Sequence, residues 1–130
     1  MLGKSFDDNR PLFLQIKERI EDQIINDAIL VDEQIPSTTQ IVDFYKVNHI
    51  TVAKGVNLLV DEGILYKKRG VGMFVAGGAK NTLIEKRQKN FKTEYLDPML
   101  VEAGKLRISK TKIVNMINER GSDENFMTSE

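Results

Sequence analysis

The sequence contains no cysteine, and His49 is its only histidine. Without thiolates the chain can form neither disulfide bonds nor cysteine-ligated metal sites, which is typical of a protein from a reducing cytosol. One histidine and no Gly-rich phosphate loop leave few ways to assemble a catalytic or metal site. The many carboxylates occur mainly as adjacent pairs on faces that we expect to be exposed. We therefore expect no enzyme activity, no metal and no cofactor.

Long apolar runs are also missing. No stretch approaches the roughly 20 apolar residues that are needed to cross a bilayer, and the N-terminus lacks the basic start and apolar run of a signal sequence. These absences predict a soluble, cytoplasmic protein with no membrane partner. The apolar content of 41% is enough for one modest core in 130 residues.

The charges balance overall, with 19 basic and 19 acidic residues, but they are unevenly distributed. Residues 1–44 carry five more acids than bases, whereas residues 45–75 carry three more bases than acids and residues 76–112 five more. The tail beyond them is acidic again. Because a local positive face matters more to a polyanion than the net charge does, the middle of the chain is a candidate nucleic-acid surface.

Three helices are predicted before residue 63. The first follows Pro11, which suits a first helical turn, and has an apolar residue at every fourth position: Leu12, Ile16, Ile20 and Ile24. The second begins after Ser37, because Ser37 and Gln40 have the spacing of a capping box.

The third helix is predicted to run from Asn48, a good N-cap, to about Glu62, with Gly63 ending it. Its inward face consists of Val52, Val56 and Leu59. Gly55 lies among these residues, where a missing side chain allows another helix to approach closely.

Two short β-prone runs, ILYKK and MFVA, flank the loop RGVG and predict a β-hairpin. Three helices with a tight turn between the second and third, closed by a hairpin, form a winged helix-turn-helix. The predicted fold class is thus mostly α with a small β-hairpin over residues 1–76. A small α+β domain with no ligand on this face is the alternative.

Residues 77–120 predict a second, helical unit after the glycine pair at 77 and 78. Pro98 is expected to kink its helix or to start a new one with Asp97 as N-cap, and Ser109 caps a last helix. The apolar residues that we expect to form the dimer interface are Ile84, Phe91, Tyr95, Met99, Ala103, Ile113, Met116 and Ile117. Such short helices cannot enclose a core, so we expect a homodimer through these residues, although folding back on the first domain is an alternative. Residues 121–130 are polar, and we expect disorder there.

Several motifs occur in the order and spacing of the GntR family of bacterial transcription regulators. They are PLFLQI, IPSTTQIVDFY and NHITVAKGVNLLVDEGILYKKRGVGMFV, and the resemblance extends roughly from Pro11 to Val75. The short basic and then apolar tail, together with NHITVAKG, resembles the YtrA-like subfamily. The resemblance implies a repressor that dimerises through its tail. Such a dimer is expected to bind double-stranded operator DNA with an inverted-repeat sequence.

The chain departs from the family pattern at several positions. The family usually has Arg two residues after the Ser of its Pro-Ser motif, where this chain has Thr39. Many members have Arg or Pro where it has His49, and the usual glycines of the first connector are Asp27 and Asp32. The Arg that usually stands at the position of Thr39 makes a strong bidentate contact with a base or a phosphate. Because this chain lacks it, the operator sequence cannot be copied from relatives.

The candidate DNA-binding residues lie on three elements: the start of the second helix, the outer face of the third, and the hairpin. The third helix is expected in the major groove and the hairpin at the minor groove or its phosphates. The full set is Ser37, Thr38, Thr39, His49, Ile50, Thr51, Lys54, Asn57, Lys67, Lys68, Arg69, Gly70 and Gly72.

Each of these assignments has a plainer alternative. His49 and Lys54 also fit as surface residues without a role, and Ile50 fits partial burial against the turn. The domain as a whole also fits a protein-interaction module without specific DNA binding. The sequence does not identify a small-molecule effector.

Overall fold

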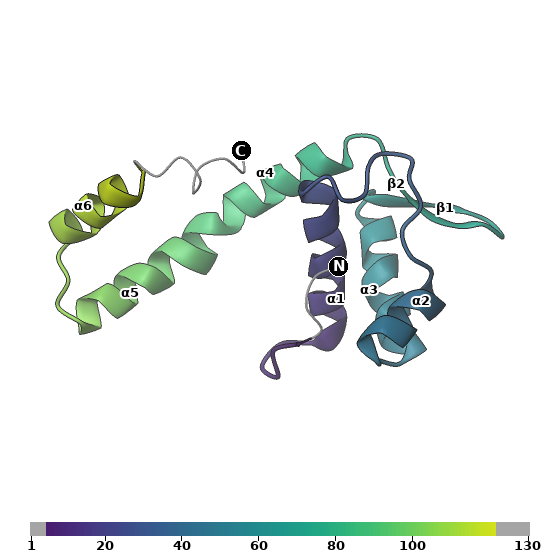
Figure 1. Ribbon diagram of the computed structural model, residues 1–130, viewed down its shortest axis with the longest axis horizontal. Coiled ribbons are helices and arrows are strands. Elements are labelled where there is room, and N and C mark those ends of the chain that lie inside the picture. Colours follow the sequence, from purple (N-terminus) through teal and green to yellow (C-terminus); the bar gives the residue numbers. More distant parts are fainter. Residues whose placement is uncertain (1–4, 122–130) are drawn as a thin grey trace. The chain divides into compact units, whose positions relative to one another are not determined.

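The computed structural model describes residues 5–121. In order along the chain, the elements are α1 (Leu12–Ile25), α2 (Thr38–Tyr45), α3 (His49–Asp61), β1 (Leu65–Lys68), β2 (Gly72–Val75), α4 (Ala79–Phe91), the π-helical turn η1 (Lys92–Leu96), α5 (Asp97–Lys105) and α6 (Lys110–Gly121). The chain divides into two compact units, Met1–Arg87 and Gln88–Glu130 (Figure 1).

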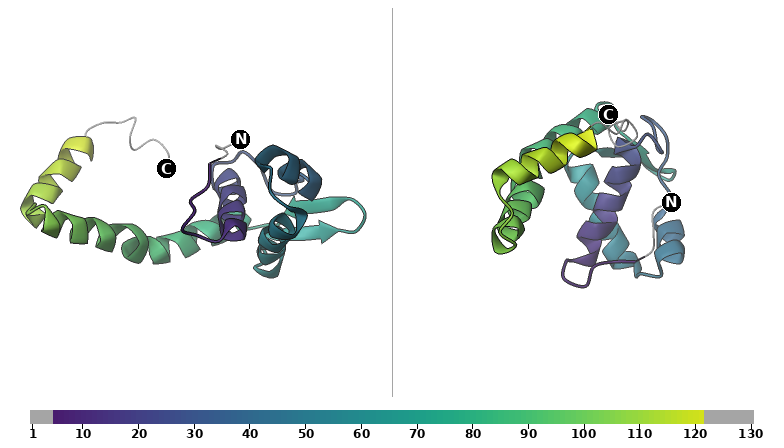
Figure 2. Two further views of the ribbon diagram at one scale, coloured as in Figure 1. Left: turned by 90° about the horizontal axis from the view of Figure 1, so that it is seen from below. Right: turned by 60° about the vertical axis from the view of Figure 1, so that its left-hand side comes forward.

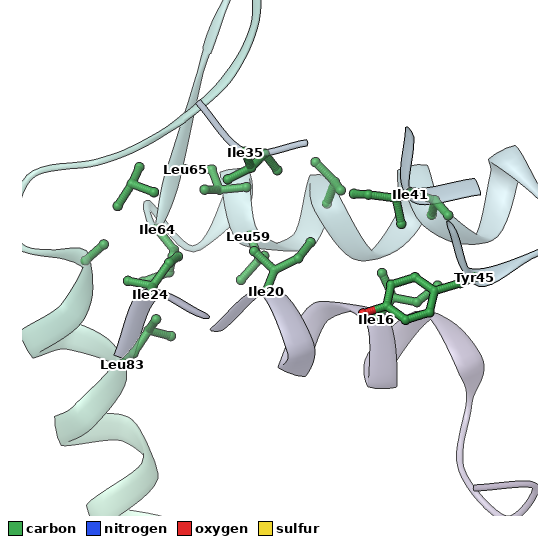
Figure 3. Packing of buried hydrophobic residues seen from close by; sticks show 14 residues of the cluster. Ile16, Ile20, Ile24, Ile35, Ile41, Tyr45, Leu59, Ile64, Leu65 and Leu83 are labelled. Atoms are coloured by element: carbon green, nitrogen blue, oxygen red, sulfur yellow. The ribbon is translucent and has the colours of Figure 1, made fainter. Parts of the chain in front are cut away.

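The first unit is a winged helix-turn-helix, which confirms the predicted fold. Helices α1 and α3 lie side by side, α2 packs against α3, and the hairpin of β1 and β2 extends beyond them (Figures 1 and 2). Isoleucines of α1 meet residues of α2, α3 and the hairpin in one apolar cluster (Figure 3). The fully buried residues of this core include Ile16, Val52, Leu59 and Val75.

Helices α1 and α3 approach each other closely at Gly55. A Cβ atom at this position would lie 2.7 Å from the backbone oxygen of Phe13 and 3.6 Å from Cγ2 of Ile16. Contacts of 2.7 Å between a Cβ and a backbone oxygen do not occur without displacement of one helix. The predicted close approach of another helix at Gly55 is therefore confirmed.

The predicted helix caps are present. Ser37 Oγ accepts a hydrogen bond from the Gln40 N–H at 3.1 Å, and the Gln40 side chain accepts one from the Ser37 N–H at 2.8 Å. Asn48 Oδ1 accepts from the Thr51 N–H at 2.7 Å. Gly63 follows α3 with φ of 77°, a conformation that glycine adopts without strain.

The hairpin is anchored by the connector before α2. Leu65 pairs with Val75, and Lys68 pairs with Gly72 next to the turn. Gln34 forms a bridge to β2 and donates from Nε2 to the Val71 oxygen at 2.9 Å. Gly72 makes room for this side chain, since a Cβ there would lie 2.3 Å from Gln34 Nε2. The loop of the hairpin is thus held in place from outside the sheet.

Asp27 and Asp32 occupy the positions where the resemblance led us to expect glycine. Both have left-handed backbone angles, with φ of 61° and 65°, which explains why glycine suits these positions. Each aspartate also has a partner. Asp27 accepts from Lys80 Nζ at 2.8 and 3.0 Å, and Asp32 Oδ1 accepts from the Tyr66 hydroxyl at 2.8 Å.

The first two turns of α4 belong to the first unit. Ala79 and Leu83 are 1% and 0% exposed and join its apolar core. Figure 3 shows Leu83 in the same cluster as Ile24. The sequence suggested a boundary after residue 76, whereas the structure separates the compact units after Arg87.

In the second unit η1 passes directly into α5, and Pro98 is the second residue of α5. The Asp97 N–H donates to the Lys92 oxygen, five residues back, so the turn before Pro98 is wider than an α-helical turn. A wider turn relieves the clash between the proline ring and the preceding carbonyls. Asp97 has helical angles, so the expected N-cap role of Asp97 is wrong.

Ser109 does cap α6, since its Oγ accepts from the Lys112 N–H at 3.1 Å. Most of the segment 121–130, where we expected disorder, lies outside the described residues.

Candidate nucleic-acid interface

The first turn of α3 is uncovered. His49 is exposed, and Ile50 is 82% exposed, a high value for an aliphatic side chain. The alternative for Ile50, partial burial against the turn, is thereby excluded. Thr51 is half-buried, and its backbone N–H donates to the Asn48 cap. A helix presents its N-terminal residues in this way when it is inserted end-first into the major groove.

Further along α3, Asn57 is exposed and Lys54 has a partner within the protein. The Lys54 ammonium lies 4.0 Å from the centre of the Phe13 ring of α1, a cation–π contact. Lys54 nevertheless remains an exposed residue. It therefore links α3 to α1, and its contact with a phosphate stays a prediction.

The N-terminus of α2 presents hydroxyl groups and backbone N–H groups. Ser37 and Thr39 are exposed and Thr38 is half-buried. The capping box uses the N–H groups of Ser37 and Gln40. The N–H groups of Thr38 and Thr39 have no acceptor within the helix, because they lie in its first turn. Such groups bind phosphate oxygens well.

The hairpin carries three cationic side chains towards its tip. Lys67, Lys68 and Arg69 are exposed, and the Lys68 ammonium lies 4.5 Å from the centre of the Phe74 ring. Within residues 5–121 neither Lys67 nor Arg69 takes part in an ion pair. Gly70 and Gly72 have φ of 77° and 147°, so the tight turn needs glycine at both positions.

A cleft of about 320 Å³ lies between the hairpin and the N-terminus of α2. Its lining brings together Ser37 and Thr38 of the capped helix end with Lys67 and Lys68 of the hairpin. Hydroxyl, backbone N–H and ammonium groups are the donors that proteins use for phosphate oxygens. The structure thus places two of the three predicted elements around one concave surface, where these donors lie among apolar residues such as Ile35 and Met73.

Two residues of this region were missing from the sequence-based set. Gln34 lines the cleft and holds the hairpin tip, and Val71 is 59% exposed at that tip. The sequence could have indicated that Val71 is exposed, because it lies between two glycines of a predicted turn. No signal in the sequence connects Gln34 with a loop 37 residues later.

The acidic residues of α1 have partners away from this surface. Glu21 and Asp22 pair with Arg87 of α4, and Glu18 pairs with Arg10. The excess of acids in residues 1–44 is therefore partly neutralised by cations of α4. Within residues 5–121 no group of three or more potential metal ligands occurs, and no helix is long and apolar enough to cross a membrane.

Residues 12–75 match the pattern of the bacterial regulatory proteins of the gntR family. The chain is similar to the arabinose metabolism transcriptional repressor of Halalkalibacterium halodurans, with 28% identity over 103 residues, 73% of this chain but only 28% of that protein. It is also similar to the transcriptional repressor YtrA of Bacillus subtilis, with 26% identity over 113 residues, 87% of this chain and 86% of that protein. The likeness to YtrA therefore includes most of the second unit.

Solved structures give the same picture. A protein of the GntR family from Bacteroides thetaiotaomicron is 33% identical, with a TM-score of 0.65 over 87% of this chain and 98% of that chain. The AraR DNA-binding domain, crystallised in complex with operator ORR3, is 36% identical with a TM-score of 0.51. That likeness covers 58% of this chain and 89% of the AraR domain.

Proposed function

Because this chain belongs to the GntR family of bacterial regulatory proteins, we propose that it is a transcriptional repressor that binds operator DNA as a homodimer. The observation that carries the proposal is the exposed first turn of α3, together with the cleft between α2 and the hairpin, which carries hydroxyl and ammonium groups. The known complex of the similar AraR domain with an operator supports it. The named relatives are regulators, so enzyme activity is not part of the proposal.

In the proposed complex α3 enters the major groove with its N-terminal end first. His49 donates to a base or phosphate acceptor, and Ile50 contacts a thymine methyl group. Thr51 and Asn57 are polar side chains on the same face. Lys67, Lys68 and Arg69 neutralise phosphates along the minor groove, and the lean turn at Gly70 and Gly72 allows close approach. Apart from Ile50, the exposed side chains of this α3 face are polar, which disfavours a protein-interaction module, for which an apolar face is expected.

The proposed dimer forms through the second unit. Phe91 and Tyr95 are 58% and 64% exposed, with their rings 5.5 Å apart. Met116 and Ile117 of α6 are about half exposed. Ala103 is buried, Met99 is 41% exposed and Ile113 is half-buried. Ile84, by contrast, is half-buried on a turn of α4 that belongs to the first unit. A second copy of the same surface would cover the exposed rings by two-fold symmetry.

The single experiment that tests this function is selection of binding sites from random duplexes, followed by a salt titration. An inverted repeat with half-sites about one helical turn apart is expected, because two-fold related α3 helices meet one face of the duplex. The logarithm of affinity should fall steeply with the logarithm of salt concentration, since several counterions are released. Equal affinity for selected and random duplexes would contradict specific regulation.

Replacing His49 or Ile50 by Ala should weaken binding to the selected operator by about 1–3 kcal/mol and affect random DNA much less. Both side chains are exposed, so the fold should be unaffected. The measurement is affinity for both duplexes over a salt series, with thermal melting as the control. If the loss were the same on random DNA, these residues would not be base readers.

Replacing Tyr95 by Glu should convert the dimer to a monomer, because a charge would be buried without a partner in the proposed interface. Sedimentation equilibrium measures the change. Thr93→Glu is the matched control, since it adds the same charge to an exposed position of η1. A Tyr95→Glu protein that sediments as a stable dimer would place the interface elsewhere.

A further inference from the structure

A cluster of charges surrounds Glu21 where α4 packs on the first unit. Glu21 is 2% exposed, yet three cations reach its carboxylate. Lys17 Nζ and Lys86 Nζ lie 3.0 and 3.5 Å from Oε2, and Arg87 Nη2 lies 3.0 Å from Oε1. Lys17 comes from α1 itself, whereas Lys86 and Arg87 come from α4.

The cluster also includes a second acid of α1 and the acid that follows α3. Arg87 Nη1 lies 2.6 Å from Asp22 Oδ1, and Arg87 Nη2 donates to the backbone oxygen of Glu18 at 3.2 Å. Glu62, directly after α3, meets Lys17 at 3.1 Å and Lys86 at 3.4 Å. We call Lys17, Glu21, Asp22, Glu62, Lys86 and Arg87 the junction cluster; all six residues belong to the first unit.

The partners of Glu21 and Arg87 favour the charged forms of both groups. Burial raises the pKa of Glu21, but hydrogen bonds from Lys17 and Arg87 outweigh it, and the pKa lies below its ordinary value of 4.5. Burial lowers the pKa of Arg87, but its hydrogen bonds to Asp22 and Glu21 outweigh that effect and raise it. Because Glu21 is buried, salt screens its ion pairs much less than exposed ones.

The contribution of the cluster is to geometry more than to stability. Buried ion pairs add little net stability, because desolvation offsets the attraction. The apolar contacts of Ala79 and Leu83 already attach α4 to the core. Arg87, in contrast, donates from both terminal nitrogens to acceptors on α1. Because the guanidinium is planar, these bonds restrict the direction of α4 as well as its distance from α1. Arg87 is the last residue of the first unit, directly before α4 passes into the second.

We infer that Arg87 and Glu21 are positioning residues that fix the direction in which α4 leaves the DNA-binding unit, and that they thereby restrict the half-site spacing of the operator. This inference rests on the proposed function, since it requires two copies on an inverted repeat. One added base pair displaces a half-site by about 3.4 Å and rotates it by about 35°. If the direction of α4 is fixed, the dimer cannot adjust to the displaced half-site. Without the junction cluster, α4 can change direction and the dimer can reach it.

The test uses the full chain and synthetic duplexes that carry the selected half-sites at the best spacing, or with one base pair inserted or removed. A fourth duplex carries a single half-site. Arg87→Met should reduce the penalty for the altered spacings by on the order of tenfold, with little change on the single half-site. A purely structural role would instead lower all four affinities together with the melting temperature.

Lys89→Met is the matched control, because Lys89 is an exposed cation half a turn further along α4, and the spacing penalty should stay unchanged. Asp22→Ala removes the 2.6 Å contact of Arg87 without touching the buried carboxylate, so it serves as the second variant if Arg87→Met folds poorly. A spacing penalty that persists in the folded variants overturns the inference. An unmodified protein without any preferred spacing contradicts the proposed dimer on an inverted repeat instead.

Discussion

Replacing Gly55 by Ala should lower the free energy of unfolding by about 2 kcal/mol, although Ala is the better helix former. Helix propensity alone favours Ala over Gly by about 1 kcal/mol. The added Cβ, however, would lie 2.7 Å from the Phe13 carbonyl oxygen, and a backbone oxygen cannot rotate away. Separation of α1 from α3 would then loosen a core that depends on fully buried residues such as Ile16 and Leu59. Overpacking of this kind costs about 1–3 kcal/mol or more.

Denaturant unfolding followed by circular dichroism measures the effect, and Gly104 provides the control. Gly104 also lies within a helix, but a Cβ there would have no heavy atom within 4 Å. Gly104→Ala should therefore be neutral or stabilising by up to about 1 kcal/mol. Opposite signs for the two variants identify the close helix approach as the cause. A Gly55→Ala protein as stable as the parent would show that α1 and α3 pack less closely than described.

Replacing Lys67 and Arg69 together by Ala should weaken binding to every duplex by on the order of 10- to 100-fold and reduce the salt slope by about two. Both side chains are exposed, and within residues 5–121 neither forms an ion pair. Contacts to phosphates carry no sequence information, so specific and random DNA should lose affinity alike. Lys68 stays in place because its ammonium packs over the Phe74 ring, and its loss would disturb the hairpin.

The control for this variant removes two positive charges elsewhere. The double variant Lys110→Ala with Lys112→Ala changes the net charge by the same amount as the hairpin variant, but on α6 of the second unit. If both double variants weakened binding to the same extent, the effect would be one of net charge and not of the hairpin. If the hairpin variant lost its preference for particular bases and kept its salt slope, the hairpin would be a base reader. Thermal melting of each variant shows whether the fold is intact.

The elements of the DNA-binding unit could be predicted from the sequence because local patterns encode them. The capping box at Ser37 and Gln40 and the N-cap at Asn48 are spaced by the geometry of one helical turn, so they mark helix starts wherever the helix finally lies. The glycines at 63, 70 and 72 mark backbone angles that other residues adopt only with strain. The exposure of the first turn of α3 follows from the same periodicity, which assigned its inward residues.

Contacts between distant segments were decided by the tertiary structure alone. Arg87 meets partners 65 and 66 residues away on α1. The basic face of α4, which the sequence suggests is exposed, therefore partly neutralises acidic residues of α1. Lys54 lies over Phe13, and Gln34 holds a hairpin loop that starts more than thirty residues later. The apolar Ala79 and Leu83 are too few to signal burial in a polar run, and only the packing of α4 against α1 places them in the core. Residue spacing determines which face a side chain occupies, but which faces meet depends on the packing of the whole chain.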